Sequence, residues 1–353
     1  MKIIIDARYK YNYSSFYILG LRKLFGRRSI TYSVKPFLSL SYSTIKEYNS
    51  GLPFIIDDNS KTYKVFIDFE DKSFISIDRY NWCDIYAKIN ATYDDLIKYP
   101  KLFVIGPSFG ISIDNKIKTI SDLISHYLKC KGNTSIGYKK YLKDYLYAFI
   151  RRRRIEKYEY KTKIRPNYIF HASTLWYNEF AWTHTNKYRG AFLKACQKAG
   201  VEIEGGLFYI GESQAVLKEM PDYPRYLIEY KDFIYRSRVN MDDYIRKTKE
   251  SFVVFNTPAV CKCHGWKLAE YLCMGKAIIS TPLTREMPCE GLIHGENIHF
   301  VYSEEEIYDA VIKIRDDKDY RLKLEKGART YYEKYLAPEK VVYRIYNRCK
   351  SNI

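Results

Sequence analysis

The sequence predicts an α/β protein with two domains, and three observations point to that class. Short apolar runs typical of strands alternate with segments whose apolar residues recur at helical spacing. Several strand-like runs end in Gly, Pro or charged residues, where open α/β sheets usually bind ligands. The chain has 353 residues, 46% of them hydrophobic, which is enough for two separate cores.

The first half, residues 1–165, begins with a strand-like segment at Lys2–Ala7 and a short helix at Phe16–Phe25. Further strands are predicted at Tyr63–Phe69, Ile85–Ile89 and Leu102–Ile105, and a helix at Lys116–Lys129. A loop with Gly and Pro follows the last of these strands. This half is therefore predicted to form one α/β domain.

A basic segment, Lys139–Arg165, closes the first half. It holds 11 Lys and Arg against 3 acidic residues, a balance of 11 − 3 = +8, close to half of the chain's net charge of +18. Its apolar residues recur at helical spacing, so one interpretation is a helix that packs on one side while Arg151–Arg154 contact an anionic membrane surface. The other is a solvated basic helix that covers the first domain. A nucleic-acid role is disfavoured because no known reader motif is present.

A new α/β pattern starts after Arg165-Pro166, where we place the domain boundary. Its predicted elements are strands at 168–172, 201–210, 232–235 and 298–301, and helical segments at 187–199, 241–249, 304–315, 318–332 and 338–349. We therefore divide the chain into domains at 1–165 and 166–337, followed by a C-terminal helical segment at 338–353.

Composition narrows the class of protein further. The net charge of +18 calls for an anionic partner such as a nucleotide, a phospholipid surface or a nucleic acid. The sequence has no apolar run of membrane-spanning length and enters a strand-like segment directly after Met1, which predicts a cytoplasmic protein. Eight cysteines without disulfide-framework spacing fit a reducing compartment. Zinc at Cys261, Cys263 and His264 is disfavoured because no second Cys pair completes a tetrahedral set.

The most informative stretch is Ser251–Leu283. Apolar runs at Phe252–Phe255 and Ala277–Ile279 predict two buried parallel strands. Between them, Trp266–Met274 predicts a helix, with Gly275 as its C-terminal stop. The stretch is thus a strand, loop, helix and strand in succession.

The loop of this stretch ends in His264-Gly265, directly before the helix. Gly265 lets a ligand approach the backbone, and first-turn N–H groups have no intrahelical partners, so the pattern predicts a phosphate site. Glu270 follows one turn later, where a carboxylate can accept two hydroxyls of a ribose.

A family resemblance rests on Gly265–Leu272, Gly275–Pro282, Met287-Pro288, His294–Ile298, Lys326–Arg329 and Tyr335–Pro338. With these residues, 167–343 resembles the nucleotide-sugar-binding domain of GT-B glycosyltransferases, of the family 1/4-like, bacterial surface-polysaccharide type. The resemblance implies two facing Rossmann-like domains with the active site in the interdomain cleft. It also implies an acceptor-binding first domain and a C-terminal helix that crosses back to it.

One residue departs from the family's pattern. Many retaining GT-B enzymes carry two Glu residues separated by seven others, the first contacting the donor sugar and the second the ribose. Glu270 matches the second, but Lys262 occupies the position of the first. The resemblance therefore does not give the stereochemical course.

Breaking the bond between sugar and diphosphate leaves negative charge on the leaving group, which cations and a helix N-terminus stabilise. The predicted donor-binding residues are Gly265, Trp266, Lys267 and Glu270, with Arg189, Arg236, Arg238, His264, Asn256, Thr257, Ser280 and Thr281 as further candidates. The alternative for each polar residue is a loop cap or turn former. No metal is predicted, because the loops lack an Asp-x-Asp pair and the basic residues can replace one.

An inverting transferase needs a general base for the acceptor hydroxyl. The candidates are Asp68, Glu70 and Asp71, at the end of a first-domain strand, and His171, at the end of a second-domain strand. The alternative is an exposed loop carboxylate for the acidic residues and a structural histidine for His171.

The sequence therefore predicts a metal-independent glycosyltransferase, a hexosyl- or deoxyhexosyltransferase, with a UDP- or GDP-linked sugar as substrate and no separate cofactor. The predicted acceptor is a glycan or lipid-linked glycan in bacterial surface polysaccharide synthesis. The predicted location is the cytoplasm, with peripheral binding to the inner face of the plasma membrane through Lys139–Arg165. The alternative is a non-catalytic nucleotide- or nucleic-acid-binding α/β protein, which salt-sensitive binding to random oligonucleotides would favour.

Overall fold

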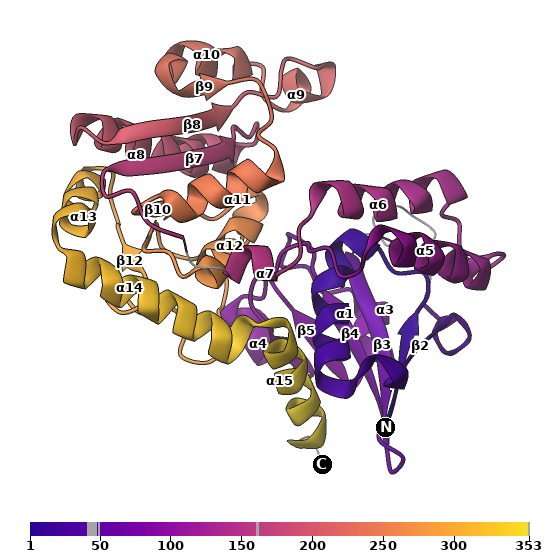
Figure 1. The fold of residues 1–353 in the computed structure, drawn as a ribbon. Helices are drawn as coiled ribbons and strands as arrows, with labels where there is room; N and C mark the ends of the chain where they lie inside the picture. The colour runs from indigo at the N-terminus through magenta and orange to yellow at the C-terminus, as the bar shows by residue number, and fades with distance from the viewer. Residues whose placement is uncertain (41–47, 49, 160–161, 352–353) are drawn as a thin grey trace. The chain divides into compact units, whose positions relative to one another are not determined.

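The computed structural model describes residues 1–40, 48, 50–159 and 162–351. Lys161 of the basic segment and residues 352–353 lie outside these ranges. The chain divides into two compact units (Figure 1). Unit 1 comprises Met1–Ile155, Arg285–Cys289 and Glu333–Ile353, and unit 2 comprises Glu156–Thr284 and Glu290–Tyr332.

Unit 1 contains a six-stranded sheet in the order β2-β1-β3-β4-β5-β6. The strands are β1 (Lys2–Asp6), β2 (Ile30–Ser33), β3 (Gly51–Asp57), β4 (Thr62–Asp68), β5 (Ile85–Lys88) and β6 (Leu102–Val104). Each neighbouring pair is parallel except that β3 runs antiparallel to both β1 and β4. The carboxyl ends of the other strands therefore meet at one edge of the sheet.

Four long helices of unit 1 pack against one another in two pairs. Its α-helices are α1 (Tyr11–Phe25), α3 (Ile77–Trp82), α4 (Tyr93–Lys98), α5 (Lys116–Cys130), α6 (Tyr138–Arg151) and α15 (Pro338–Ser351), with 3₁₀ turns at Arg27–Ser29 and Lys35–Phe37. Helix α15 packs on α1, where a Cβ on Gly20 would meet the Pro338 carbonyl. The glycine thus permits the close approach of the two helices.

Unit 2 contains two parallel three-stranded ladders, β7-β8-β9 and β10-β11-β12. The strands are β7 (Tyr168–Thr174), β8 (Glu202–Phe208), β9 (Ile234–Tyr235), β10 (Val254–Asn256), β11 (Ile278–Ser280) and β12 (His299–Phe300). The Phe252 N–H, just before β10, donates to the Tyr168 carbonyl at the start of β7, 3.0 Å away. The two ladders therefore adjoin at β7 and β10.

The joined order of unit 2 is β9-β8-β7-β10-β11-β12, the doubly wound arrangement of a Rossmann-like domain. Successive strands add on one side of β7 and then on the far side of β10. The direction of chain growth thus reverses between these two strands. In such sheets ligands bind outside the carboxyl ends of the strands at this switch point.

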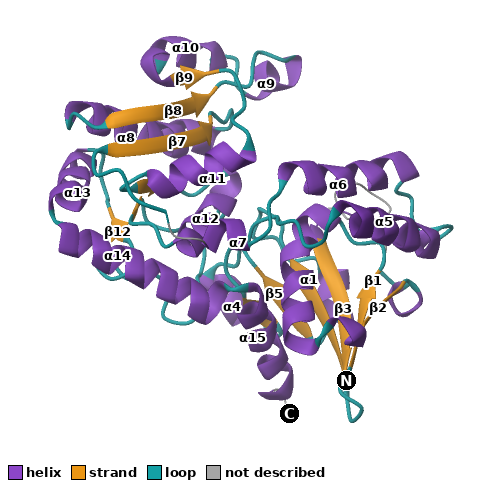
Figure 2. Cartoon of the chain, in the orientation of Figure 1, coloured by secondary structure: helices purple, strands orange, loops and turns teal. Residues whose placement is uncertain are grey.

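Helices flank the sheet of unit 2, with α8 along β8 and α11 along β7 (Figure 2). The α-helices are α7 (Glu156–Glu159), α8 (Lys187–Lys198), α9 (Gln214–Glu219), α10 (Tyr226–Glu229), α11 (Met241–Glu250), α12 (Trp266–Met274), α13 (Glu305–Asp316) and α14 (Lys318–Tyr331). Shorter turns lie at Tyr223–Arg225, Lys231–Phe233 and Val260–Lys262, and a π-helical turn at Ala181–Asn186. A second π-helical turn, Tyr332–Leu336, begins at the last residue of unit 2 and continues in unit 1. In the core the rings of Phe192 and Phe255 stack 4.7 Å apart.

The predicted α/β fold class is confirmed by both units. The units divide at 155/156, shortly before the predicted boundary at 165, because α7 packs on α12. Residues Arg285–Cys289 also belong to unit 1, although the sequence analysis assigned them to the second domain. No helix within the described ranges is long and apolar enough to cross a bilayer.

Candidate functional site

The predicted strand, loop, helix and strand of Ser251–Leu283 form β10, α12 and β11 at the switch point of unit 2. Helix α12 begins at Trp266 and ends at Gly275, whose left-handed φ of 63° closes it as predicted. The loop before α12 and the end of β7 contain the side chains described below.

The N-terminus of α12 is capped by Gly265, without a side-chain hydrogen bond. Gly265 has φ −79° and ψ 153°, a conformation open to any residue, so the backbone does not require glycine here. A Cβ at this position would meet only the Ala259 Cβ, at 3.7 Å. The missing side chain thus leaves space beside the positive end of the helix dipole.

Two cations reach the end of β7 from neighbouring helices. The Lys267 ammonium, on α12, donates to the Ala172 carbonyl and to Ser173 Oγ, 2.7 Å away in the second case. The Arg189 guanidinium, on α8, donates to the Thr174 carbonyl at 3.0 Å. Both cations therefore contact the last residues of the strand that borders the switch point.

Neither cation forms a salt bridge within the described part of unit 2, although the Glu270 carboxylate favours the charged form of Lys267. Burial and, to a smaller extent, the charge of Arg189 lower the pKa of Lys267 to about 7, with Glu270 offsetting part of the shift. Burial likewise lowers the pKa of Arg189 to about 10. Lys267 is partly exposed to solvent, whereas Arg189 is only 8% exposed. An anion bound here would stabilise the charged forms of both side chains.

Polar residues at the ends of β10 and β11 complete the site. Asn256 Nδ2 donates to Ser280 Oγ at 2.9 Å, and the Ser280 hydroxyl donates to the Thr281 carbonyl at 2.7 Å. Thr257 Oγ1 accepts from Arg189 Nε at 3.2 Å. Thr281 Oγ1 is buried and has no hydrogen-bond partner among the described residues. Asn256, Thr257 and Ser280 thus brace the two strand ends, and Thr281 retains hydrogen-bonding capacity.

Glu270 lies one turn into α12 and is 4% exposed. One of its carboxylate oxygens, Oε2, accepts from the Tyr244 hydroxyl at 2.6 Å. Tyr244 comes from α11 and was not predicted as a site residue. Its contact fixes the orientation of the carboxylate that the sequence assigns to a ribose.

The loop before α12 contains the position where this chain departs from the family's pattern. Cys261 and Lys262 both adopt left-handed conformations, with φ of 62° and 57°. Such conformations are strained for residues with a Cβ and concentrate at functional sites. The Lys262 carbonyl accepts from Thr284 Oγ1 at 2.6 Å, which holds this turn in place.

The remaining predicted donor residues lie at different depths. His264 is buried at the end of the loop, and Trp266 is partly exposed at the first position of α12. Arg236 and Arg238 are exposed beyond β9, over the rings of Tyr209 and Phe208. Strand β9 is two strands away from β7, so these arginines lie at the same sheet edge but outside the group around Lys267.

Asp68, a predicted base, is a buried carboxylate at the end of β4 in unit 1. Its Oδ2 accepts from the Lys88 ammonium at 2.7 Å and from the Tyr86 hydroxyl at 2.6 Å. Its Oδ1 accepts from the Glu70 N–H at 2.8 Å. These contacts favour a structural ion pair at Asp68. Glu70 is partly exposed and Asp71 exposed, so of the three carboxylates these two have the freer access to solvent.

His171, the other predicted base, is 2% exposed inside β7 of unit 2. Burial lowers its pKa well below the usual value, and the charges of Lys267 and Arg189 lower it further. The imidazole is therefore neutral, and its Nε2 has no hydrogen-bond partner among the described residues. Its place beside the two cations associates His171 with the candidate anion site; its role as a base stays a prediction.

Sequence reasoning missed Ser173 and Thr174 as well as Tyr244. A signal for the first two was present, because polar residues directly after the apolar run of β7 mark a strand end. No sequence signal pointed to Tyr244, whose hydroxyl reaches Glu270 from α11.

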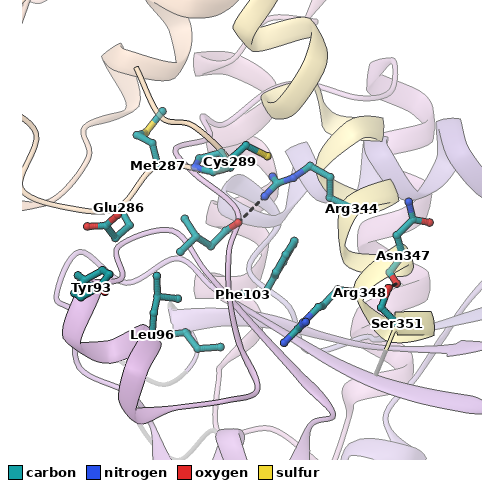
Figure 3. A pocket seen from close by; sticks show the side chains of 13 residues that line it. Tyr93, Leu96, Phe103, Glu286, Met287, Cys289, Arg344, Asn347, Arg348 and Ser351 are labelled. Atoms are coloured by element: carbon teal, nitrogen blue, oxygen red, sulfur yellow. Dashed lines mark hydrogen bonds between the residues drawn. The ribbon is translucent and has the colours of Figure 1, made fainter. Parts of the chain in front are cut away.

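Unit 1 has an open pocket of about 610 Å³ between α4, β6, Arg285–Cys289 and α15 (Figure 3). Arg344 spans it and donates to the Val104 carbonyl at 2.8 Å. None of the predicted site residues lines this pocket. The candidate anion site in unit 2 is thus the place where the predicted residues gather.

No protein-family model and no curated protein matches the chain. Solved structures do. A glycosyltransferase from Rickettsia africae is 10% identical, with 81% of this chain and 70% of that chain covered and a TM-score of 0.44. Sucrose-phosphate synthase from Thermosynechococcus elongatus is 10% identical, with 81% and 68% covered and a TM-score of 0.40. HepE from Anabaena, in complex with UDP-glucose, is 12% identical, with 76% and 79% covered and a TM-score of 0.37.

Proposed function

We propose that the protein is a glycosyltransferase that uses a nucleoside-diphosphate sugar as donor. The observation that carries the proposal is a pair of cations with no salt bridge among the described residues, the partly exposed Lys267 and the buried Arg189, beside the glycine-capped N-terminus of α12. This combination suits a diphosphate, because backbone N–H groups, the helix dipole and two cations all favour negative charge at one point. Glu270 is the proposed ribose ligand.

The same groups also act in the chemical step of sugar transfer. As the bond from the anomeric carbon to the diphosphate breaks, charge accumulates on the leaving phosphate oxygens. Lys267 and the first turn of α12 are fixed in position before the reaction, so they stabilise that charge without reorganisation. The proposed transfer therefore needs no metal ion to neutralise the leaving group.

The finer parts of the proposal concern donor and acceptor. The donor is a UDP- or GDP-linked hexose or deoxyhexose, and the acceptor is a glycan or lipid-linked glycan of a bacterial surface polysaccharide. The acceptor base is sought among Glu70, Asp71, Asp68 and His171. Given the ion pair of Asp68 and the burial of His171, Glu70 and Asp71 are favoured.

A nucleotide panel tests the proposal. UDP, GDP and CMP and their sugar conjugates are added to the protein, and thermal unfolding is followed, then release of nucleotide from the conjugates. At about 100 times its dissociation constant a ligand adds roughly 2.7 kcal/mol to stability, so a measurable rise in Tm is expected for one nucleoside diphosphate and its sugar. Absence of stabilisation by every nucleotide would exclude a donor site.

Replacing Gly265 with Ala separates ligand contact from folding. The added methyl group meets one ordinary van der Waals contact, so the Tm of the unliganded variant is expected to stay close to that of the wild type. A nucleoside diphosphate that lies against the Gly265 backbone should bind about tenfold more weakly or worse, which calorimetric titration would measure.

Gly137→Ala is the matched control, because Gly137 also caps a helix, α6, in open space. It is expected to leave both folding and nucleotide affinity unchanged. Equal nucleotide affinity of Gly265→Ala and Gly137→Ala would place the phosphates elsewhere.

A further inference from the structure

Helix α5 of unit 1 has apolar side chains on two opposite faces. One packs into the unit and buries Leu123, His126 and Cys130. The other is exposed and carries four aliphatic side chains, Ile117, Ile120, Ile124 and Leu128, with exposed fractions of 81%, 37%, 49% and 64%. Their spacing of three or four residues aligns them along the helix. We call these four residues the α5 stripe.

The exposed charges around the α5 stripe are mostly positive. Between 116 and 151 the acidic residues, Asp122 and Asp144, are 8% and 7% exposed. The basic residues all keep at least partial solvent exposure: Lys116, Lys118, Lys129, Lys131, Lys139, Lys140, Lys143 and Arg151. Lys118 forms an ion pair with Asp122, and the other lysines and Arg151 leave the helical hairpin α5–α6 with an aliphatic line in a predominantly cationic surface.

The hairpin is firmly attached to unit 1. Helix α5 packs against α6, and α6 packs against α1. Asp144 Oδ2, on α6, accepts from the Asn12 N–H in the first turn of α1, 3.4 Å away. The Tyr141 hydroxyl donates to the Ala7 carbonyl at 2.8 Å. The inner faces of the pair are thus occupied, and the outward faces are the ones available to a partner.

An anionic lipid bilayer fits both properties of this surface. Aliphatic side chains gain by leaving water for the acyl boundary, and lysines around them gain from anionic headgroups. A second copy of the chain would bring like charges together, which opposes pairing through this face. A nucleic acid would satisfy the charge but offers aliphatic side chains no stacking or hydrogen bonding.

We propose that the α5–α6 hairpin binds anionic membrane surfaces with the α5 stripe inserted at the acyl boundary. The proposal rests on the lipid-linked acceptor named in the proposed function, and it names residues other than the predicted Arg151–Arg154. Arg152 Nε donates to Asn12 Oδ1 at 3.0 Å, so the side chain of this arginine helps to hold unit 1 together, whereas Arg151 and Arg154 are exposed. The predicted contact through Arg151–Arg154 stays a prediction, to which this inference adds one through α5.

Flotation with vesicles tests the proposal on the full chain. Wild-type protein is expected to float with vesicles of equal parts phosphatidylcholine and phosphatidylglycerol and to stay behind with pure phosphatidylcholine. The triple variant Ile117→Ser, Ile124→Ser, Leu128→Ser should bind the anionic vesicles at least about tenfold more weakly. Lys139→Gln with Lys143→Gln should weaken binding by about fivefold per lysine, more at low salt.

Ile228→Ser is the matched control, because Ile228 is 79% exposed on α10 of unit 2. It is expected to bind vesicles as the wild type does. Circular dichroism checks the fold of each variant; should the triple variant unfold, the two-lysine variant decides.

Three outcomes would overturn the proposal. They are anionic-vesicle binding that the triple variant leaves unchanged, equal binding of the wild type to neutral vesicles, and a wild-type dimer in sedimentation that the triple variant dissociates. Nucleotide-induced stabilisation is measured on the same samples. A chain that binds nucleotide but not vesicles retains its donor site and loses only this inference.

Discussion

Lys267→Met is expected to lower kcat/KM for the sugar donor by about 10²- to 10³-fold, the usual effect of removing one fixed donor to a developing anion. The lysine is the cation that reaches the end of β7 from α12 itself, at the helix N-terminus. Initial rates with the donor found in the nucleotide panel would measure the effect. A change below about threefold would show that Lys267 does not contact the leaving group.

The same substitution is expected to stabilise the unliganded protein. The pKa of Lys267 is lowered to about 7 in the folded chain, so folding opposes the charged ammonium. A group with a depressed folded pKa binds fewer protons when folded, so stability rises with pH between the two pKa values. Methionine has no charge to bury, and its advantage in Tm should therefore be greatest at pH 6 and shrink toward pH 9.

Lys276→Met provides the control for this pair of effects. Lys276 is also buried, with a pKa lowered to about 8, but its ammonium donates to the carbonyls of Lys249 and Ser251. That substitution should change stability while leaving the donor affinity unchanged. Equal loss of donor affinity in both variants would indicate a general disturbance of unit 2.

Nucleotide affinity is expected to fall by close to tenfold per pH unit between pH 7 and pH 9. A diphosphate beside Lys267 raises the pKa of its ammonium above the value of about 7 in the unliganded protein. Binding in this range therefore takes up a proton. Calorimetric titrations in buffers of different ionisation enthalpy would count that proton directly.

Lys267→Arg tests the assignment of the proton. Arginine stays charged throughout this range, so the variant should bind nucleotide with little dependence on pH between 7 and 9. His171, whose pKa lies well below its usual value, does not titrate in this range. A pH dependence that persists unchanged in Lys267→Arg would assign the proton to another group.

Most strands of unit 2 could be predicted from short apolar runs that alternate with helical segments, whereas their order in the sheet came from the structure. In unit 1 the same reasoning missed β3, Gly51–Asp57. This strand contains Pro53, which usually argues against a central strand, yet it pairs with β1 and β4 on either side. Gly51 admits the Phe66 ring where a Cβ would collide with it. Such tertiary contacts produce no periodic pattern in the sequence.

For the candidate site, the loop and the helix could be located from the sequence, but the residues that contact their side chains could not. Gly265, Lys267 and Glu270 follow from the spacing of one helix and its N-terminus. The contact of Lys267 with the end of β7 joins residues far apart in the chain. Asp68 illustrates the converse, because its strand-end position suggested a base, whereas the pairing of β4 with β5 brings Lys88 to its carboxylate.

A crystal structure of the protein with the nucleoside diphosphate that stabilises it most would test the central claim most directly. The account predicts the diphosphate at the N-terminus of α12, with phosphate oxygens within hydrogen-bond distance of the Lys267 ammonium and the Gly265 backbone. It also predicts the ribose hydroxyls at Glu270. A nucleotide bound elsewhere in unit 2, with Lys267 still bonded only to Ala172 and Ser173, would contradict it.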